Sequence, residues 1–183
     1  MLSLLRLKHW QLFSLIVVLP LVLILSDGTL SLSPESQGSK SAISILGFAL
    51  SFGFLLGWFY ALGTGLHAKV TSSVKLGLGI FKAAVLIPTA YCLVVCIFML
   101  LGVGSRSSQF HMTGAFIGAF VILHLLSLAS MFYLLFFVAK EMKAVEFNRS
   151  GSFSDFAGEF FLTWFWPIGI WVIQPRINKL FAK

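Results

Sequence analysis

The stretch FSDFAGEFFLTWFWPIGIWVIQPRINK, residues 153–179, decides the topology of the whole chain. It concentrates Phe and Trp between a polar start and a basic end, and Pro167 interrupts it midway. Segments that are rich in Trp, broken by Pro and closed by Arg and Lys lie at a membrane surface more readily than across a membrane. Whether this stretch crosses therefore determines on which side the C-terminal residues lie.

The composition is typical of a membrane protein. Of the 183 residues, 58% are hydrophobic and only 10% are charged, and the mean hydropathy is +0.98, whereas a soluble domain carries about 25% charged residues. We expect a single membrane domain over residues 1–183, because no soluble stretch is long enough to form a second core. The net charge of +7 indicates contact with anionic lipid head groups rather than with nucleic acid.

The apolar runs predict four membrane-spanning helices separated by polar or basic connections. The first follows Arg6 and Lys8 and has no small-x-small cleavage pattern, so we interpret it as a retained anchor, bent at Pro20, rather than a signal peptide. The predicted fold class is an all-α integral membrane protein, a four-transmembrane-helix bundle with a C-terminal Trp-rich segment that is interfacial or re-entrant. The predicted spans are 10–26, 43–66, 83–103 and 112–138, and the predicted interfacial segment is 153–173.

Small residues recur at helical spacing in two of these spans. In lipid, a face of small and polar residues lets another helix approach closely and supplies polar groups across the contact. Helix packing is the plainer interpretation of such a face, and a lined pathway is the alternative. The face in the second span consists of Gly53, Gly57, Tyr60, Thr64 and His67. The fourth span carries a GxxxG pair at Gly114 and Gly118.

The distribution of basic residues predicts the orientation. With the N-terminus in the cytoplasm and four crossings, 11 of the 13 basic residues fall on the cytoplasmic side, and only Lys40 and Arg106 face outward. A fifth crossing would move Arg176, Lys179 and Lys183 outside and change the split to 8 against 5. Because Lys and Arg favour cytoplasmic connections, we predict that both termini are cytoplasmic, in a bacterial cytoplasmic membrane.

Few residues suggest catalysis. No Asp or Glu lies inside a predicted span and no Lys or Arg lies deep in one, which disfavours proton-coupled carriers and pumps. The chain has no G-x-S-x-G, H-E-x-x-H, P-loop or C-x-x-C pattern. Cys92 and Cys96 share a face of the third span and His124 lies near the middle of the fourth, a set that suits a soft metal ion. In the competing interpretation the cysteines are small buried hydrophobes, and His124 bonds to a backbone carbonyl or to Ser127.

The end of the aromatic segment joins amide and basic groups to Trp residues. This combination suits a lipid phosphate or an acidic partner, and anchoring at the interface alone is the plainer interpretation. In both cases the aromatic rings set the depth and the basic groups supply the charge. The residues concerned are Trp164, Trp166, Trp171, Arg176 and Lys179.

The leading functional hypothesis is a non-enzymatic role in assembly or interaction, as a homo-oligomer or with other membrane subunits. Two GxxxG faces, a large aromatic interfacial segment and the missing catalytic patterns favour it. A small channel or facilitator lined by the Gly53–His67 face is the alternative. A membrane enzyme acting on lipid or redox substrates through Cys92, Cys96 and His124 is a weaker one. Anionic lipids on the cytoplasmic side are expected partners, and neither a cofactor nor nucleic acid is predicted.

Overall fold

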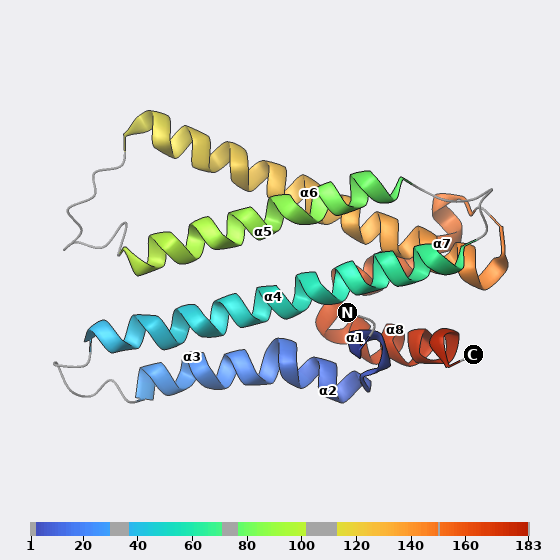
Figure 1. Cartoon of the computed structure of the whole chain (residues 1–183), viewed down its shortest axis with the longest axis horizontal. Coiled ribbons are helices and arrows are strands. Elements are labelled where there is room, and N and C mark those ends of the chain that lie inside the picture. Colours follow the sequence, from blue (N-terminus) through green and yellow to red (C-terminus); the bar gives the residue numbers. More distant parts are fainter. Residues whose placement is uncertain (1–2, 30–36, 71–76, 102–112, 150, 183) are drawn as a thin grey trace.

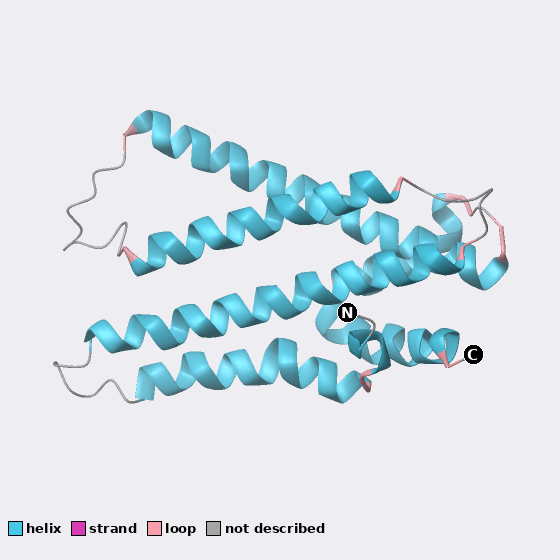
Figure 2. Ribbon diagram, in the orientation of Figure 1, coloured by secondary structure: helices cyan, strands magenta, loops and turns pink. Residues whose placement is uncertain are grey.

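The computed structural model describes residues 3–29, 37–70, 77–101, 113–149 and 151–182, and within these ranges every regular element is a helix. Figures 1 and 2 show these helices, which are named here in their order along the chain. They are α1 (Ser3–Arg6), α2 (His9–Phe13), the π-helical turn η1 (Ser14–Val18), α3 (Leu19–Thr29), α4 (Gln37–Lys69), α5 (Leu78–Leu100), α6 (Gly114–Phe147), α7 (Phe153–Trp164) and α8 (Trp166–Phe181).

Among the described residues, four helical stretches are long and apolar enough to cross a membrane, as many as the sequence predicted. They are His9–Ser26, Ala42–Lys69, Leu78–Leu100 and Gly114–Phe147. The fourth predicted span continues as a helix beyond residue 138 as far as Phe147, where Asn148 adopts a left-handed conformation and ends it. α3 packs along α4, α5 packs along α6, and α4 also contacts both α5 and α6, so α4 is the central helix (Figure 1).

The first span contains a local irregularity at its proline. Pro20 has no backbone N–H to donate to the carbonyl of Ile16 four residues earlier, and the π-helical turn η1, which contains Ile16, ends two residues before the proline. The hydroxyl of Ser51 in α4 donates to that carbonyl oxygen at 2.9 Å. The polar group that proline leaves without its usual helical donor is thus bonded by the neighbouring helix.

The glycines at which helices of the chain pack tightly are not those of the predicted faces, and Gly63 is one of them. A Cβ atom placed on Gly63 would overlap the ring of Phe81, which is fully buried and stacks on Phe137 with ring centroids 4.3 Å apart. In contrast, a Cβ atom on Gly53, Gly114 or Gly118 would have no described atom within 4 Å. A Cβ atom on Gly57, the other glycine of the predicted face in α4, would meet only Leu4, at 3.6 Å. Packing on the predicted GxxxG faces therefore remains a prediction about contacts with other molecules.

The C-terminal aromatic segment forms two helices rather than one. Pro167 lies in the first turn of α8, where a missing N–H is tolerated, and Phe165 between the two helices has non-helical dihedral angles. α7 packs on α6, while α8 packs on α7 and on the N-terminal helices α1 and α2. Both arms are shorter than a membrane span, with 12 and 16 residues.

The turn between α7 and α8 lies beside the middle of the long helices. Trp164 at the end of α7 packs edge-on against Phe132, with ring centroids 4.8 Å apart. Phe132 precedes the last residue of α6 by 15 positions, roughly 22 Å along a helix. At the other end of the hairpin, the Lys69 ammonium group in the last turn of α4 donates to the carbonyl of Leu180. The α7–α8 hairpin thus starts and finishes at the same end of the bundle and reaches halfway along it.

Candidate functional site

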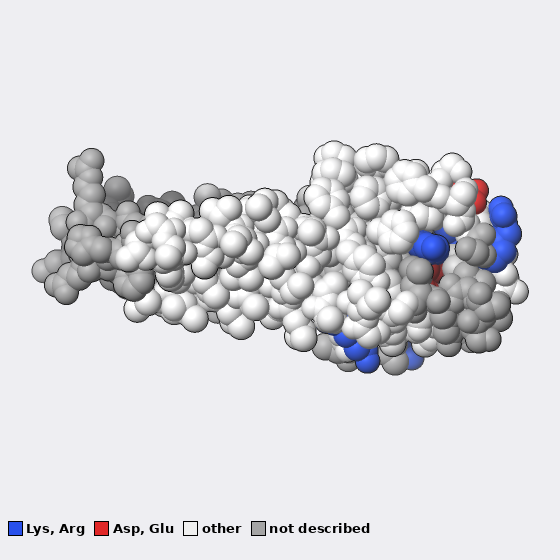
Figure 3. Space-filling model, turned by 90° about the horizontal axis from the view of Figure 1, so that it is seen from above, with Lys and Arg blue, Asp and Glu red and all other residues white. Residues whose placement is uncertain are grey.

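The charged end is our name for the end of the bundle where α4 and α6 finish, α5 starts and the α7–α8 hairpin has both its ends. On the face drawn in Figure 3, the visible Lys, Arg, Asp and Glu atoms gather at this end. The site is built from polar side chains that connect helices distant in sequence. Its ionisable members include Arg6, Lys8, His67, Glu141, Lys143, Glu146, Glu159 and Arg176.

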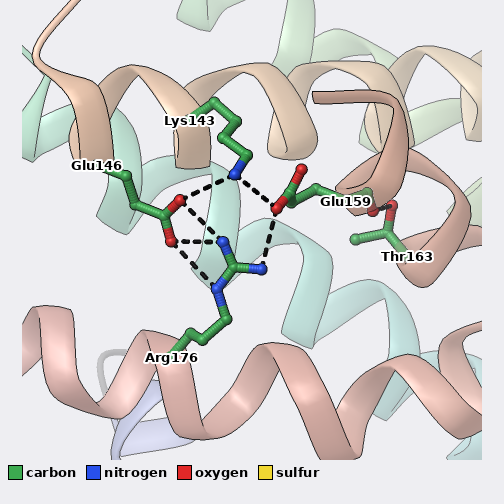
Figure 4. Close-up of polar contacts among 5 residues, drawn as sticks. All are labelled: Lys143, Glu146, Glu159, Thr163 and Arg176. Atoms are coloured by element: carbon green, nitrogen blue, oxygen red, sulfur yellow. Dashed lines mark hydrogen bonds and ion pairs between the residues drawn. The ribbon is translucent and has the colours of Figure 1, made fainter. Parts of the chain in front are cut away.

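Four charged side chains tie α6 to both arms of the hairpin (Figure 4). Oε1 of Glu159 in α7 lies 2.9 Å from the Lys143 ammonium nitrogen and 2.9 Å from Nη1 of Arg176. The Arg176 guanidinium group also donates to both oxygens of Glu146, at 2.7 and 2.8 Å from Nη2. Lys143 completes the network with a 3.3 Å contact to Glu146. Two cations oppose two anions, so the four-charge network is neutral in sum.

Burial makes this network more consequential than an exposed ion pair. Glu159 is only 6% exposed, and a carboxylate removed from water is costly unless charged donors compensate it. Burial alone would raise the pKa of Glu159, but the hydrogen bonds from Lys143 and Arg176 outweigh this effect and hold the pKa below its usual value. Burial would likewise lower the pKa of Arg176, yet hydrogen bonds to Glu146 and Glu159 raise it. Both shifts favour the ionised forms of Glu159 and Arg176.

The start of α7 is fixed by a reciprocal cap. The backbone N–H and the hydroxyl of Ser152 both donate to Oδ2 of Asp155, at 2.8 and 3.1 Å, and the backbone N–H of Asp155 donates to the Ser152 carbonyl at 3.0 Å. A serine followed three residues later by an acidic residue is a helix-start pattern, and α7 begins directly after this serine. The hydrogen bond from the Ser152 backbone lowers the pKa of Asp155.

Gln174 and Asn178 of α8 attach the N-terminal segment to the bundle. The Gln174 side chain is fully buried, accepts from the Trp58 indole N–H at 3.0 Å and donates to the carbonyl of Leu7 at 2.9 Å. It also lies within hydrogen-bonding distance of the carbonyls of Leu4 and Leu5, and Asn178 donates to Leu7 at 3.1 Å. These carbonyls belong to α1 and the residue after it, where the end of a helix leaves carbonyl groups unbonded. The basic and amide segment predicted to meet lipid or a partner thus holds helices together through Gln174, Arg176 and Asn178.

His67, predicted to close the polar face of the second span, contacts a carboxylate. Its Nδ1 lies 3.0 Å from Oε1 of Glu141, which is 1% exposed. Elsewhere on that face, the Thr64 hydroxyl donates to the Tyr60 carbonyl of its own helix. The Tyr60 ring stacks on the ring of Phe81. These three side chains are occupied by contacts within the chain.

The three proposed metal ligands are not brought together. Among the described residues, no group of three or more His, Cys, Asp and Glu side chains could hold a metal ion. Cys92 and Cys96 are free thiols on α5. Nδ1 of His124 instead lies 2.9 Å from the Tyr91 hydroxyl, so His124 pairs with a tyrosine of the neighbouring helix rather than with Ser127 or a backbone carbonyl.

The predicted lipid-contact residues occupy different environments. Trp164 and Trp166 lie at the turn of the hairpin, and Trp171 packs against the His9 ring at 4.8 Å. Arg176 belongs to the four-charge network, whereas Lys179 is exposed. The sequence pattern did not point to Glu159 as a site residue. A carboxylate inside an aromatic segment nevertheless indicates that a cationic partner lies nearby.

An apolar groove of about 370 Å³ lies between α4, α6 and the turn of the hairpin. Among the described residues that line it, Ser51 and Thr163 carry hydroxyl groups, and both hydroxyls donate to backbone carbonyls. The lining residues are Ser51, Phe52, Leu55, Phe59, Leu128, Met131, Phe132, Leu135, Thr163, Trp164 and Trp166.

The fold and the site define an all-helical chain with four helices of membrane-spanning length and a C-terminal hairpin fastened by ion pairs. Comparisons with protein-family models, with curated proteins and with solved structures found no match. Functional inference for this protein therefore starts from its own geometry.

Proposed function

We propose that this protein is a small, non-enzymatic integral membrane protein that acts by assembling with other membrane chains, as a homo-oligomer or as a subunit of a complex. The observation that carries the proposal is the open surface at Gly114 and Gly118. Both residues are exposed, and a side chain at either position would meet no described atom within 4 Å. In lipid, a helix surface with small residues four apart permits close approach of a second helix.

The arrangement of the charged end supports a cytoplasmic location for both termini. Its described residues include nine basic and four acidic ones, and cytoplasmic connections carry the excess of Lys and Arg. The basic residues are Arg6, Lys8, Lys69, Lys82, Lys140, Lys143, Arg149, Arg176 and Lys179, and the acidic ones are Glu141, Glu146, Asp155 and Glu159. In this orientation the α7–α8 hairpin enters the membrane from the cytoplasm and returns to it, and its exposed apolar turn residues Phe165 and Ile168 face lipid.

The contacts of the polar residues favour assembly over the other two hypotheses. Glu159 and Glu141 are both paired with basic side chains of another helix, which is what a structural role requires. Tyr60, Thr64 and His67 are bonded or packed within the chain, so a pathway along their face has less support. An enzyme using Cys92, Cys96 and His124 would need these groups close together, and they are not.

Mass measurement of the purified chain in nanodiscs tests the proposal. We expect a defined oligomer or a co-purified membrane subunit, and we expect Gly114→Leu/Gly118→Leu to reduce its population. Ala115→Leu/Ala119→Leu is the matched control, because these exposed residues of α6 lie one position further round the helix. A chain that is monomeric with no bound subunit from native membrane, and whose mass the glycine variant leaves unchanged, would contradict the proposal.

A further inference from the structure

A second cavity lies at the charged end, between the start of the chain and the end of α8. Its volume is about 450 Å³. One wall comes from the N-terminal segment and the other from the last turn of α8. The lining residues are Leu5, Arg6, Lys8, Asn178, Phe181 and Ala182.

The two cations of this cavity are not neutralised by the part of the chain that the structure describes. Arg6 and Lys8 are exposed, and neither makes an ion pair or a cation–π contact with any described residue. Lys143 and Arg176, in contrast, share two carboxylates. Arg6 and Lys8 are therefore available to an external anion, whereas Arg176 is already paired with two carboxylates.

The backbone that carries these cations is held in place by partly buried hydrogen bonds. Gln174 and Asn178 both donate to the carbonyl of Leu7, which lies between Arg6 and Lys8 in the sequence. A ligand at this cavity meets a backbone that is already ordered, which lowers the entropic cost of binding.

Apart from Asn178, the other residues that line the cavity are apolar. Leu5 is buried in its wall, and Phe181 closes the other side. Trp10 lies two residues beyond Lys8 and is half exposed, and Trp side chains favour the level of the lipid head groups. Two cations beside an apolar wall, at the level of the lipid head groups, suit a ligand with a phosphate group and apolar chains.

We infer that Arg6 and Lys8, presented by the fixed N-terminal segment, form a binding site for the phosphate head group of an anionic phospholipid. The inference rests on the proposed membrane insertion but not on oligomer formation. It places specific lipid binding at the N-terminal segment, whereas the predicted contact at Arg176 and Lys179 would place it on α8.

Native mass spectrometry of the full chain, titrated with phosphatidylglycerol or with zwitterionic phosphatidylcholine, tests the site. Arg6→Gln/Lys8→Gln removes the two cations, and Lys82→Gln/Arg149→Gln is a control that removes one Lys and one Arg from exposed positions outside the cavity. We expect the first variant to lose affinity for phosphatidylglycerol about tenfold and the control to lose about twofold or less. Arg6→Lys/Lys8→Arg, which keeps both charges, should retain binding.

Each other outcome overturns the site. Equal losses in the two double variants would show that the lipid responds only to total charge, and no loss in either would show that these cations do not contact it. Displacement of the lipid by millimolar inorganic phosphate would identify a free anion as the ligand. If the double variant does not fold, Lys8→Gln is compared with Lys82→Gln in the same way. The same spectra report the oligomer mass, so a failure of this site and a failure of the proposed assembly are distinguishable.

Discussion

Nη1 of Arg176 and Oε1 of Glu159 lie 2.9 Å apart, and this contact bridges the two arms of the α7–α8 hairpin. The same Glu159 oxygen accepts from Lys143 of α6, so a single buried carboxylate connects three helices (Figure 4). The hairpin is thereby fastened at the charged end, while its turn packs through Trp164 against the middle of α6.

The first prediction concerns this carboxylate. Glu159→Gln removes the anion that Lys143 and Arg176 share and leaves two cations facing only Glu146. Breaking a buried pair by removing one partner costs about 3–5 kcal/mol, but Arg176 is one-third exposed and solvent screens it, so we expect a loss of about 1–3 kcal/mol. Urea unfolding in mild detergent measures the change. Lys179→Gln, an exposed change on α8, the helix of Arg176, should alter stability by less than about 0.5 kcal/mol. Equal losses in the two variants would contradict the structural role of the network.

The second prediction is that acid loosens the hairpin. The pKa of Glu159 is lower in the folded chain than in the unfolded one because Lys143 and Arg176 donate to its charged form. Its contribution to stability is therefore complete above the unfolded-state pKa, about 4.3, and is lost as the pH falls through the lower folded-state pKa. Hydrogen exchange of residues 153–181 should accelerate in that acidic window in the wild-type chain. In Glu159→Gln this acid-dependent step should be smaller, and an identical step in both proteins would assign it to other groups.

The third prediction distinguishes the glycines that pack inside the chain from those that do not. Gly63→Ala would force the buried Phe81 ring away from α4, and Phe81 cannot move without disturbing its stacking on Phe137. Overpacking of this kind costs about 1–3 kcal/mol. Gly118→Ala adds the same methyl group where no described atom lies within 4 Å, so it should leave the stability of the chain unchanged or slightly raise it. Thermal unfolding of the two variants in the same detergent gives the comparison, and equal effects would show that Phe81 yields freely.

Local signals in the sequence predicted part of this structure well. The four spans follow from apolar runs that are nearly as long as the lipid core is thick, or longer, and the start of α7 follows from Ser152 and Asp155, which are three residues apart. These features depend on neighbours in the sequence. Pro167 likewise marks the break in the aromatic segment, although it does not say in which direction the second helix leaves.

The contacts between distant residues could not be predicted in this way. Arg176 meets Glu146 across 30 residues, and Trp58 meets Gln174 across 116. Such pairs depend on which side of each helix faces the bundle, and a uniformly apolar helix carries little periodicity from which to read it. For the same reason the GxxxG pattern pointed to Gly53 and Gly57, whereas the tight contact with Phe81 is at Gly63. The choice between an interfacial and a re-entrant segment also depended on packing, since both satisfy the same charge distribution.

The last prediction concerns the depth of the hairpin turn. Trp164 packs against Phe132 in the middle of α6, whereas Trp10 lies near the basic N-terminal segment, and both rings are exposed enough to meet lipid. If the hairpin enters the membrane and returns, brominated lipids should quench a variant with Trp164 alone most strongly from deep in the bilayer, and a variant with Trp10 alone most strongly near the head groups. Deep quenching of Trp164 would also be expected of a crossing helix, so a reporter fused after Lys183 provides the second measurement.

A cytoplasmic reporter with a deep Trp164 supports the hairpin, because the chain has then reached the bilayer interior and returned. An external reporter would mean that the segment crosses, and a shallow Trp164 would mean that the segment lies flat in the interface; either result would contradict the re-entrant arrangement.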